Sequence, residues 1–131
     1  MEKNIEDVRK AFSEDRFATE NGAVIDEIGE GYAKCSMKLT SCHKNAMGAV
    51  MGGVYFTLAD FAFAVASNWK KMRTVSISTN IAFLGAAKGE ILTAEAHCVK
   101  DGRTTCYYSI DVMDESGKIT AAVTITGCHV A

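Results

Sequence analysis

The carboxylate of Asp60 is the only charged side chain in residues 48–68, whose sequence is GAVMGGVYFTLADFAFAVASN. Apolar surroundings disfavour the charged form of an acid, raise its pKa and make it a stronger base. Such a carboxylate can take a proton from water or attack a carbonyl itself. A purely structural role is also compatible with the spacing, because a hydroxyl of Thr74, Ser76 or Ser78 could satisfy it. Residue types and spacing leave both interpretations open.

The stretch around Asp60 predicts a buried helix. Residues 46–67 are long and apolar enough for a membrane span, but Asp60 would cost about 2.5–3.5 kcal/mol near the bilayer centre. Alternating strands in the same chain also need an apolar element to cover them, so we expect a core helix and no membrane association. At about 100° per residue, the small and polar residues of this helix share one face and leave space beside the carboxylate: Gly53, Thr57, Asp60, Ala64 and Ser67.

Period-two alternation predicts strands on both sides of this helix. An amphipathic helix over residues 5–17 comes first, and two short strands, 23–28 and 32–39, follow with a glycine turn between them. After the apolar helix, alternation returns in residues 74–83, 92–98, 104–112 and 119–125. Asp101-Gly102 and Ser116-Gly117 are typical hairpin turns. Because no linker or repeat divides the chain, we expect a single domain over residues 1–131.

Composition excludes several classes of function. The net charge is −2 and the pI is about 5.9, so we expect no nucleic-acid partner, which would need a basic face. The five cysteines form no C-x-x-C pair, and residues 1–10 are charged, which together predict a cytoplasmic protein with free thiols. Cys42 with His43, and His97 with Cys98, lack the usual metal-ligand spacing, so we expect no metal site.

Residues 43–68, HKNAMGAVMGGVYFTLADFAFAVASN, resemble the signature of the PaaI-like acyl-CoA thioesterases, the phenylacetate-pathway group of the 4-hydroxybenzoyl-CoA thioesterase superfamily. That signature is similar to H-x-N-x-x-G-x-x-H-G-G-x-x-x-x-L-x-D, and these residues fit it in register: His43, Asn45, Gly48, Gly52, Gly53, Leu58 and Asp60. The resemblance covers most of the chain. It implies an α+β hotdog fold, in which a curved antiparallel sheet wraps a long central helix, with βαββββ order after an N-terminal helix.

The resemblance also implies a chemistry, hydrolysis of an acyl-CoA thioester. The Gly52 N–H at the helix N-terminus would polarise the carbonyl, and Asn45 would orient the substrate or water. Asp60 would act as general base or nucleophile, and Ser76 would hold water near it. In this family the site is shared across a dimer, with Gly52 and Asn45 from one subunit and Asp60 from the other, and we expect homodimers to assemble into a homotetramer.

Further residues are expected to contact the substrate. The residues around the helix start are candidates for the acyl group, and basic residues are candidates for the phosphates of coenzyme A, which belongs to the substrate and is not a cofactor. The acyl set is Met51, Gly53, Phe56 and Thr57; the basic set is Lys100 and Arg103, or else Lys70, Lys71 and Arg73. No metal or redox cofactor is implied. We expect His43 to organise the loop, and His97 and His129 to be surface or interface residues.

Met51 departs from the signature, which usually has histidine at this position. A thioether cannot donate a proton or a hydrogen bond. The change favours either a less polar, more aliphatic substrate site or reduced activity. Two alternatives therefore stay open: a non-catalytic protein on the same fold that binds acyl thioesters or aromatic ligands, and a hotdog dehydratase or hydratase. The second would need a catalytic histidine, and Met51 occupies the nearest place for one.

Overall fold

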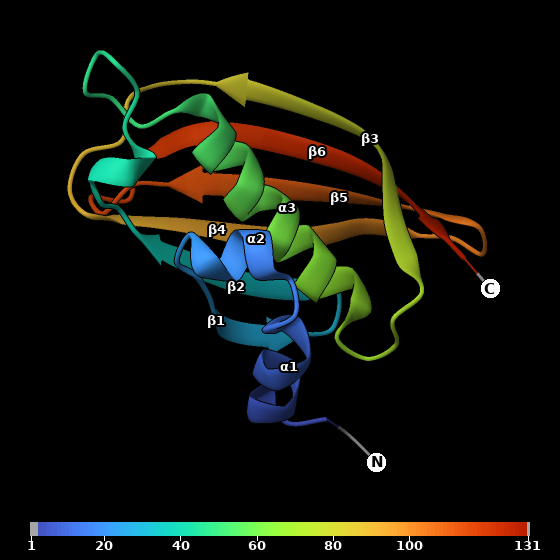
Figure 1. Cartoon of the computed structure of the whole chain (residues 1–131). Coiled ribbons are helices and arrows are strands. Elements are labelled where there is room, and N and C mark those ends of the chain that lie inside the picture. Colours follow the sequence, from blue (N-terminus) through green and yellow to red (C-terminus); the bar gives the residue numbers. More distant parts are fainter. Residues whose placement is uncertain (1–2, 131) are drawn as a thin grey trace.

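A computed structural model describes residues 3–130, and in it a six-stranded antiparallel sheet curls around one long helix (Figure 1). The helices are α1 (Ile5–Phe12), α2 (Arg16–Glu20) and α3 (Gly52–Asn68), and a 3₁₀ turn spans Ser41–His43. The strands are β1 (Ala23–Gly29), β2 (Tyr32–Lys38), β3 (Thr74–Phe83), β4 (Ile91–Asp101), β5 (Thr105–Met113) and β6 (Ile119–His129). This arrangement confirms the hotdog fold.

The sheet has the strand order β1-β2-β4-β5-β6-β3, and every neighbouring pair is antiparallel. The chain leaves β2, passes through α3 and returns as β3 at the opposite edge, so α3 crosses the concave face (Figure 1). Alternate residues of the strands point at the helix: Leu92, Ala94 and Ala96 of β4 are fully buried. The period-two alternation of the sequence therefore marks the inner face of the sheet.

α3 packs against the sheet with its bulky side and leaves a stripe of small and polar residues less covered. Leu58, Ala59 and Val65 are fully buried, whereas the predicted stripe of Gly53, Thr57, Asp60, Ala64 and Ser67 is only partly buried or exposed. At the other end, the Asn68 side chain ties the helix to the next strand. Its Oδ1 accepts hydrogen bonds from the N–H groups of Arg73 (2.9 Å) and Thr74 (2.8 Å).

The expected helix over residues 5–17 is wrong in its second half, because it breaks into α1 and α2. The Ser13 N–H bonds the carbonyls of Arg9 and Lys10, and the Asp15 N–H bonds the Phe12 carbonyl, which forms a tight turn. Phe12 continues the buried stripe of α1 and is 3% exposed. Phe17 lies five residues further on, off that stripe, and is 75% exposed on α2.

Two strands, not one, precede the central helix, so the strand order is ββαββββ, as the alternation of residues 23–39 indicates. The hairpin predicted at Asp101-Gly102 is present, with the Gly102 N–H donating to the Thr105 carbonyl at 2.8 Å. The second, at Ser116-Gly117, has Gly117 at φ +89°. Within residues 3–130, no helix combines the length and apolar character needed to cross a membrane.

Candidate active site

The N-terminus of α3 has no side-chain cap. Met51 is the N-cap residue, and its thioether accepts no hydrogen bond from the helix. The first N–H groups of a helix have no intrahelical acceptor and carry partial positive charge. Among the described residues, none accepts a hydrogen bond from the Gly52 or Gly53 N–H. These two groups are free to bind a carbonyl oxygen.

Gly52 is needed for its size. A Cβ atom built at this position would lie 3.1 Å from the Phe83 ring, which stacks edge-on against Tyr55 with ring centroids 6.1 Å apart. Phe83 itself is 57% exposed. The aromatic ring thus forms one side of the approach to the Gly52 N–H, and glycine leaves the other side open.

His43 anchors the loop that leads into α3. Its Nδ1 accepts a hydrogen bond from the Thr40 N–H (2.9 Å), so Nε2 carries the proton and donates to the Asn21 carbonyl (2.7 Å). The His43 carbonyl in turn accepts from the Met51 N–H at 2.9 Å. With 4% of its surface exposed, His43 is a structural residue, which confirms the expectation that it organises the loop.

Asn45 closes the loop with its side-chain oxygen. Oδ1 accepts from the N–H groups of Met47 (2.9 Å) and Ala49 (3.1 Å), and Gly48 adopts φ +81° to complete the turn. These donors fix the orientation of the amide, since Oδ1 must face them. The Nδ2 group is left to meet a ligand, so Asn45 can act only as a hydrogen-bond donor toward one.

Asp60 lies partly buried on the uncovered stripe of α3. No described residue donates a hydrogen bond to its carboxylate, and none of the strand hydroxyls considered from the sequence does so; Thr74 binds His129 instead. Burial raises the pKa of Asp60 above its usual value, and the nearby negative charge of Asp15 raises it further. An unpartnered acid of this kind is poised to accept a proton.

Gly52 and Asp60 do not form one site within a single chain. They are eight residues apart on α3, which corresponds to about 12 Å along the helix axis. A thioester carbonyl and its attacking water lie within a few ångströms of each other. Within one chain, Gly52 and Asp60 are therefore too far apart to contact the same carbonyl group.

Of the remaining predicted site residues, three line one cavity beside the start of α3 and two, Phe56 and Ser76, do not. Met51, Gly53 and Thr57 line one small cavity of about 90 Å³ together with Phe17, Met37 and Val54, and the Thr57 hydroxyl is held by the Gly53 carbonyl at 2.8 Å. Phe56 is 39% exposed and lies outside that lining. Ser76 is exposed on the edge strand β3 and has no hydrogen bond to Asp60.

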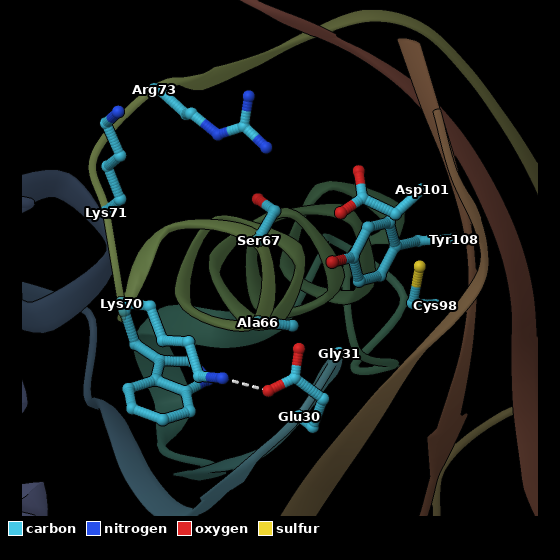
Figure 2. A pocket seen from close by; sticks show the side chains of 11 residues that line it. Glu30, Gly31, Ala66, Ser67, Lys70, Lys71, Arg73, Cys98, Asp101 and Tyr108 are labelled. Atoms are coloured by element: carbon cyan, nitrogen blue, oxygen red, sulfur yellow. Dashed lines mark hydrogen bonds and ion pairs between the residues drawn. The ribbon is translucent and has the colours of Figure 1, made fainter. Parts of the chain in front are cut away.

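A larger cavity of about 490 Å³ lies beyond the C-terminal end of α3 (Figure 2). Lys70, Lys71 and Arg73 line it, whereas Lys100 and Arg103 do not. Lys70 is already paired with Glu30, which Figure 2 shows as a dashed line. Lys71 and Arg73 are the cations of this cavity that form no ion pair with another described residue.

Two features of the site region were not predicted from the sequence. Asp15 acts on Asp60 although the two are far apart in the chain, and burial raises the pKa of Asp15 as well. Phe17 belongs to the cavity beside Met51 only because α2 turns away from α1. The polar run Ser13-Glu14-Asp15 is the one local sign of that turn.

The surface position expected for His129 is wrong. Its side chain is 7% exposed and bonds both Thr74 (Nδ1 to Oγ1, 2.9 Å) and Asp101 (Nε2 to Oδ1, 2.7 Å). His97 is a surface residue beside Glu95, as expected, and Cys42 Sγ is 3.9 Å from His43 Nδ1. Neither belongs to a group of three metal-binding side chains within residues 3–130.

Known proteins resemble this chain in sequence and in fold. Residues 47–121 match the family model of the thioesterase superfamily. A protein from Archaeoglobus fulgidus that carries an esterase name is 41% identical over 100 residues, covering 76% of this chain and 65% of that protein. The acyl-coenzyme A thioesterase PaaI of Escherichia coli is 32% identical over 84% of this chain and 79% of its own length.

Solved structures agree with the sequence matches. The structure of the Escherichia coli PaaI protein has a TM-score of 0.85 at 25% identity and covers 98% of this chain and 97% of that one. A thioesterase from Streptococcus pneumoniae solved with coenzyme A also has a TM-score of 0.85, at 26% identity, over 93% of this chain and 96% of that one. The chain belongs to the thioesterase superfamily, a class of thioester hydrolases. Within that class it is a PaaI-like hotdog protein, as the signature in residues 43–68 predicts.

The environment of Asp60 predicts a specific dependence of stability on pH. Since its folded-state pKa is raised, the charged form is costly at neutral pH, and the cost disappears as pH falls through that raised pKa. We expect Asp60→Asn to unfold at higher urea concentration than the wild type at pH 7, with the difference shrinking toward about pH 4. Urea unfolding at both pH values measures this effect.

The matched control is Asp26→Asn, which neutralises an exposed carboxylate on β1. If Asp60→Asn is less stable than the wild type at pH 7, Asp60 has a stabilising partner and the description of it as an unpartnered acid is wrong.

Proposed function

We propose that this protein hydrolyses acyl-CoA thioesters to a free acid and coenzyme A. The observation that carries the proposal is the Asp60 carboxylate, which accepts no hydrogen bond from the described residues although it is partly buried in the most apolar helix of the fold. No buried polar side-chain atom of the described residues lacks a partner, so the unpartnered carboxylate of Asp60 is accessible to water or substrate. The proposal is supported by the acyl-CoA thioesterase name of the Escherichia coli relative and by the coenzyme A bound in the Streptococcus pneumoniae structure.

In the proposed reaction, the thioester carbonyl oxygen binds the Gly52 N–H, and the donor stabilises the negative charge that develops on it. Asp60 either takes a proton from the attacking water or attacks the carbonyl carbon itself, forming an anhydride that water then hydrolyses. The C–S bond breaks, and the thiolate of coenzyme A leaves and is protonated. Asn45 Nδ2 orients the substrate or water, and Ser76 holds water near Asp60.

A second copy of the chain completes this site. Gly52 and Asp60 of one chain are about 12 Å apart along α3. Two antiparallel α3 helices would bring Gly52 of each subunit beside Asp60 of the other. The edge strand β3 is suited to pair with its own copy, because it has no neighbour on one side and exposes Val75 (49%) and Ile77 (61%). We propose a homodimer on this edge, which assembles further into a homotetramer.

Met51 adapts the site to aliphatic acyl groups. Its terminal methyl group occupies the space over Gly53, where a built Cβ would lie 2.8 Å from it, and Phe17 and Val54 line the same small cavity. A histidine would place a polar ring there. The alternative of a dehydratase loses support, since both ring nitrogens of His43, the histidine of the signature, are committed to backbone groups. The five cysteines, all free, fit the proposed location in the cytoplasm.

Thiol release from a panel of aromatic, short and long acyl-CoAs tests the activity, with Asp60→Asn as the decisive variant. We expect a loss of about 10²–10⁴-fold in kcat, the usual contribution of a general base. Asp26→Asn should hydrolyse at the wild-type rate. A wild-type protein that releases no thiol but binds acyl-CoA would instead establish the non-catalytic alternative.

Mixing two inactive variants tests whether the site is shared. Gly52→Asp places a negative charge where the oxyanion forms, and its Cβ atom also approaches the exposed Phe83 ring. A mixed dimer with Asp60→Asn contains one intact site, so random exchange should restore about a quarter of wild-type activity. No recovery, once exchange is verified by native mass spectrometry, would place the whole site in one chain.

Lys71 and Arg73 are proposed to bind the phosphates of coenzyme A. Replacing both with Gln should raise KM for an acyl-CoA by about tenfold, in keeping with the value of hydrogen bonds between charged groups. The KM for the same acyl group on N-acetylcysteamine, which has no phosphates, should not change. Lys100→Gln with Arg103→Gln is the matched pair, and a KM increase in that pair alone would move the phosphate site there.

Met51→His tests the acyl preference. We expect the ratio of kcat/KM for hexanoyl-CoA to that for 4-hydroxyphenylacetyl-CoA to fall by about tenfold, a typical effect of one altered pocket contact. Met47→His is the control, because Met47 is 92% exposed in the preceding loop. An unchanged ratio would mean that Met51 does not contact the acyl group.

A further inference from the structure

Three side chains with different metal-binding atoms converge at the end of the sheet far from Gly52. They are Asp101 at the end of β4, Cys106 near the start of β5 and His129 at the end of β6. One ligand atom of each, a carboxylate oxygen, the thiol sulfur and a ring nitrogen, lies within 4.8 Å of the other two. None of the three side chains acts on the thioester in the proposed hydrolysis, although Asp101 borders the cavity to which the phosphates of coenzyme A are assigned.

The strand register places these three side chains on the same face of the sheet, close to one another. Asp101 is directly opposite Cys106 in the β4–β5 register, and Cys106 is opposite Gly127, two residues before His129. In a regular strand Cys98 and Asp101 would face opposite sides of the sheet. A bulge between Cys98 and Lys100 shifts the register and turns Asp101 to the inner face. Bulges commonly re-aim a side chain at functional positions.

The imidazole of His129 is held in place from its far side. Its Nδ1 lies 2.9 Å from Oγ1 of Thr74, which is 7% exposed, and its Nε2 points to the Asp101 carboxylate at 2.7 Å. Metal-binding histidines are oriented in this way by a second group on the other ring nitrogen. The buried thiol of Cys106, 3% exposed, provides the third ligand atom.

The group has access to solvent on one side. Asp101 is about half exposed and lines the 490 Å³ cavity, where Figure 2 shows it beside Tyr108 and Cys98 and across from Lys71 and Arg73. Among the described residues its ion-pair partner is His129 and not Arg73. A water molecule from the cavity can therefore fill a fourth coordination position.

We propose that Asp101, Cys106 and His129 form a binding site for a divalent zinc ion. Thiolate, imidazole and carboxylate are the three ligand types that zinc prefers in proteins, and three protein ligands with one water are a common set. Ligand atoms around one zinc ion are roughly 3–4 Å apart, so small side-chain rotations bring this group to coordination distance. The ion would join β4, β5 and β6 at the end of the sheet where Thr74 begins β3.

Direct metal titration of the chelator-treated full chain tests the site without any assay of hydrolysis. We expect one equivalent of Zn²⁺ per chain by calorimetry, and a rise in melting temperature with added Zn²⁺ because binding to the folded state stabilises it. Co²⁺ in place of Zn²⁺ should give the near-ultraviolet band of a thiolate-bound cobalt ion. Cys106→Ala and His129→Gln should abolish that band.

Cys106→Ala and His129→Gln change buried side chains and can disturb folding. Two further variants, which disturb the core less, therefore test the same site. Asp101→Asn changes a half-exposed side chain and should weaken Zn²⁺ binding at least tenfold. Thr74→Val keeps the shape but removes the group that orients His129, and should weaken binding about 10–100-fold. Far-UV circular dichroism verifies that both variants are folded.

The matched control is His97→Gln with Glu95→Gln, which removes another histidine–carboxylate neighbour, 3.8 Å apart, on the surface of the same sheet. It should bind Zn²⁺ as the wild type does. The proposal is overturned if the wild type takes up no metal, if no thiolate–cobalt band appears, or if Asp101→Asn binds Zn²⁺ as tightly as the wild type.

Discussion

The burial of one side of α3 against the curved sheet is the interaction on which the rest of the structure depends. Leu58, Ala59, Ala62 and Val65 lose all exposure to solvent there, each stabilising the fold by removing apolar surface from water. A helix packed in this way keeps a fixed rotation about its axis. That rotation determines which residues stay uncovered, so the position of Asp60 is a consequence of core packing and needs no separate device.

The same packing explains why the ends of α3 differ in chemistry. Its N-terminus has no side-chain cap and free N–H groups, while its C-terminus is tied through Asn68 to the first residues of β3. A side-chain cap at the N-terminus would add stability to the helix. The fold does without that stabilisation at the place where a carbonyl group is proposed to bind, as functional sites often do.

Much of this could be predicted from the sequence, since the decisive signals are local. Alternation marked the strands, glycines marked the turns, and the rotation of 100° per residue placed Asp60 on the uncovered stripe. The break after Phe12 was missed because it depends on a few backbone hydrogen bonds in a polar run that also suits a helix. Asp15 near Asp60, and His129 between Thr74 and Asp101, were missed because those contacts join residues distant in sequence. The register of the folded strands brings His129 to Asp101, whereas the packing of α2 on α3 places Asp15 near Asp60.

The loop before α3, residues 43–51, is held by hydrogen bonds at both ends and is exposed to solvent in its middle. His43 ties its start to Asn21 and to Met51, and Asn45 closes the turn across Ala49, while Met47 stands almost fully in solvent. A loop held in this way can change at its tip without moving the helix that follows. Residues 46 and 47 can therefore vary while Gly48 keeps the turn and the backbone donors of α3 keep their place. The anchoring by His43 and Asn45 thus separates the start of α3, where the carbonyl group is proposed to bind, from a loop tip that can diversify.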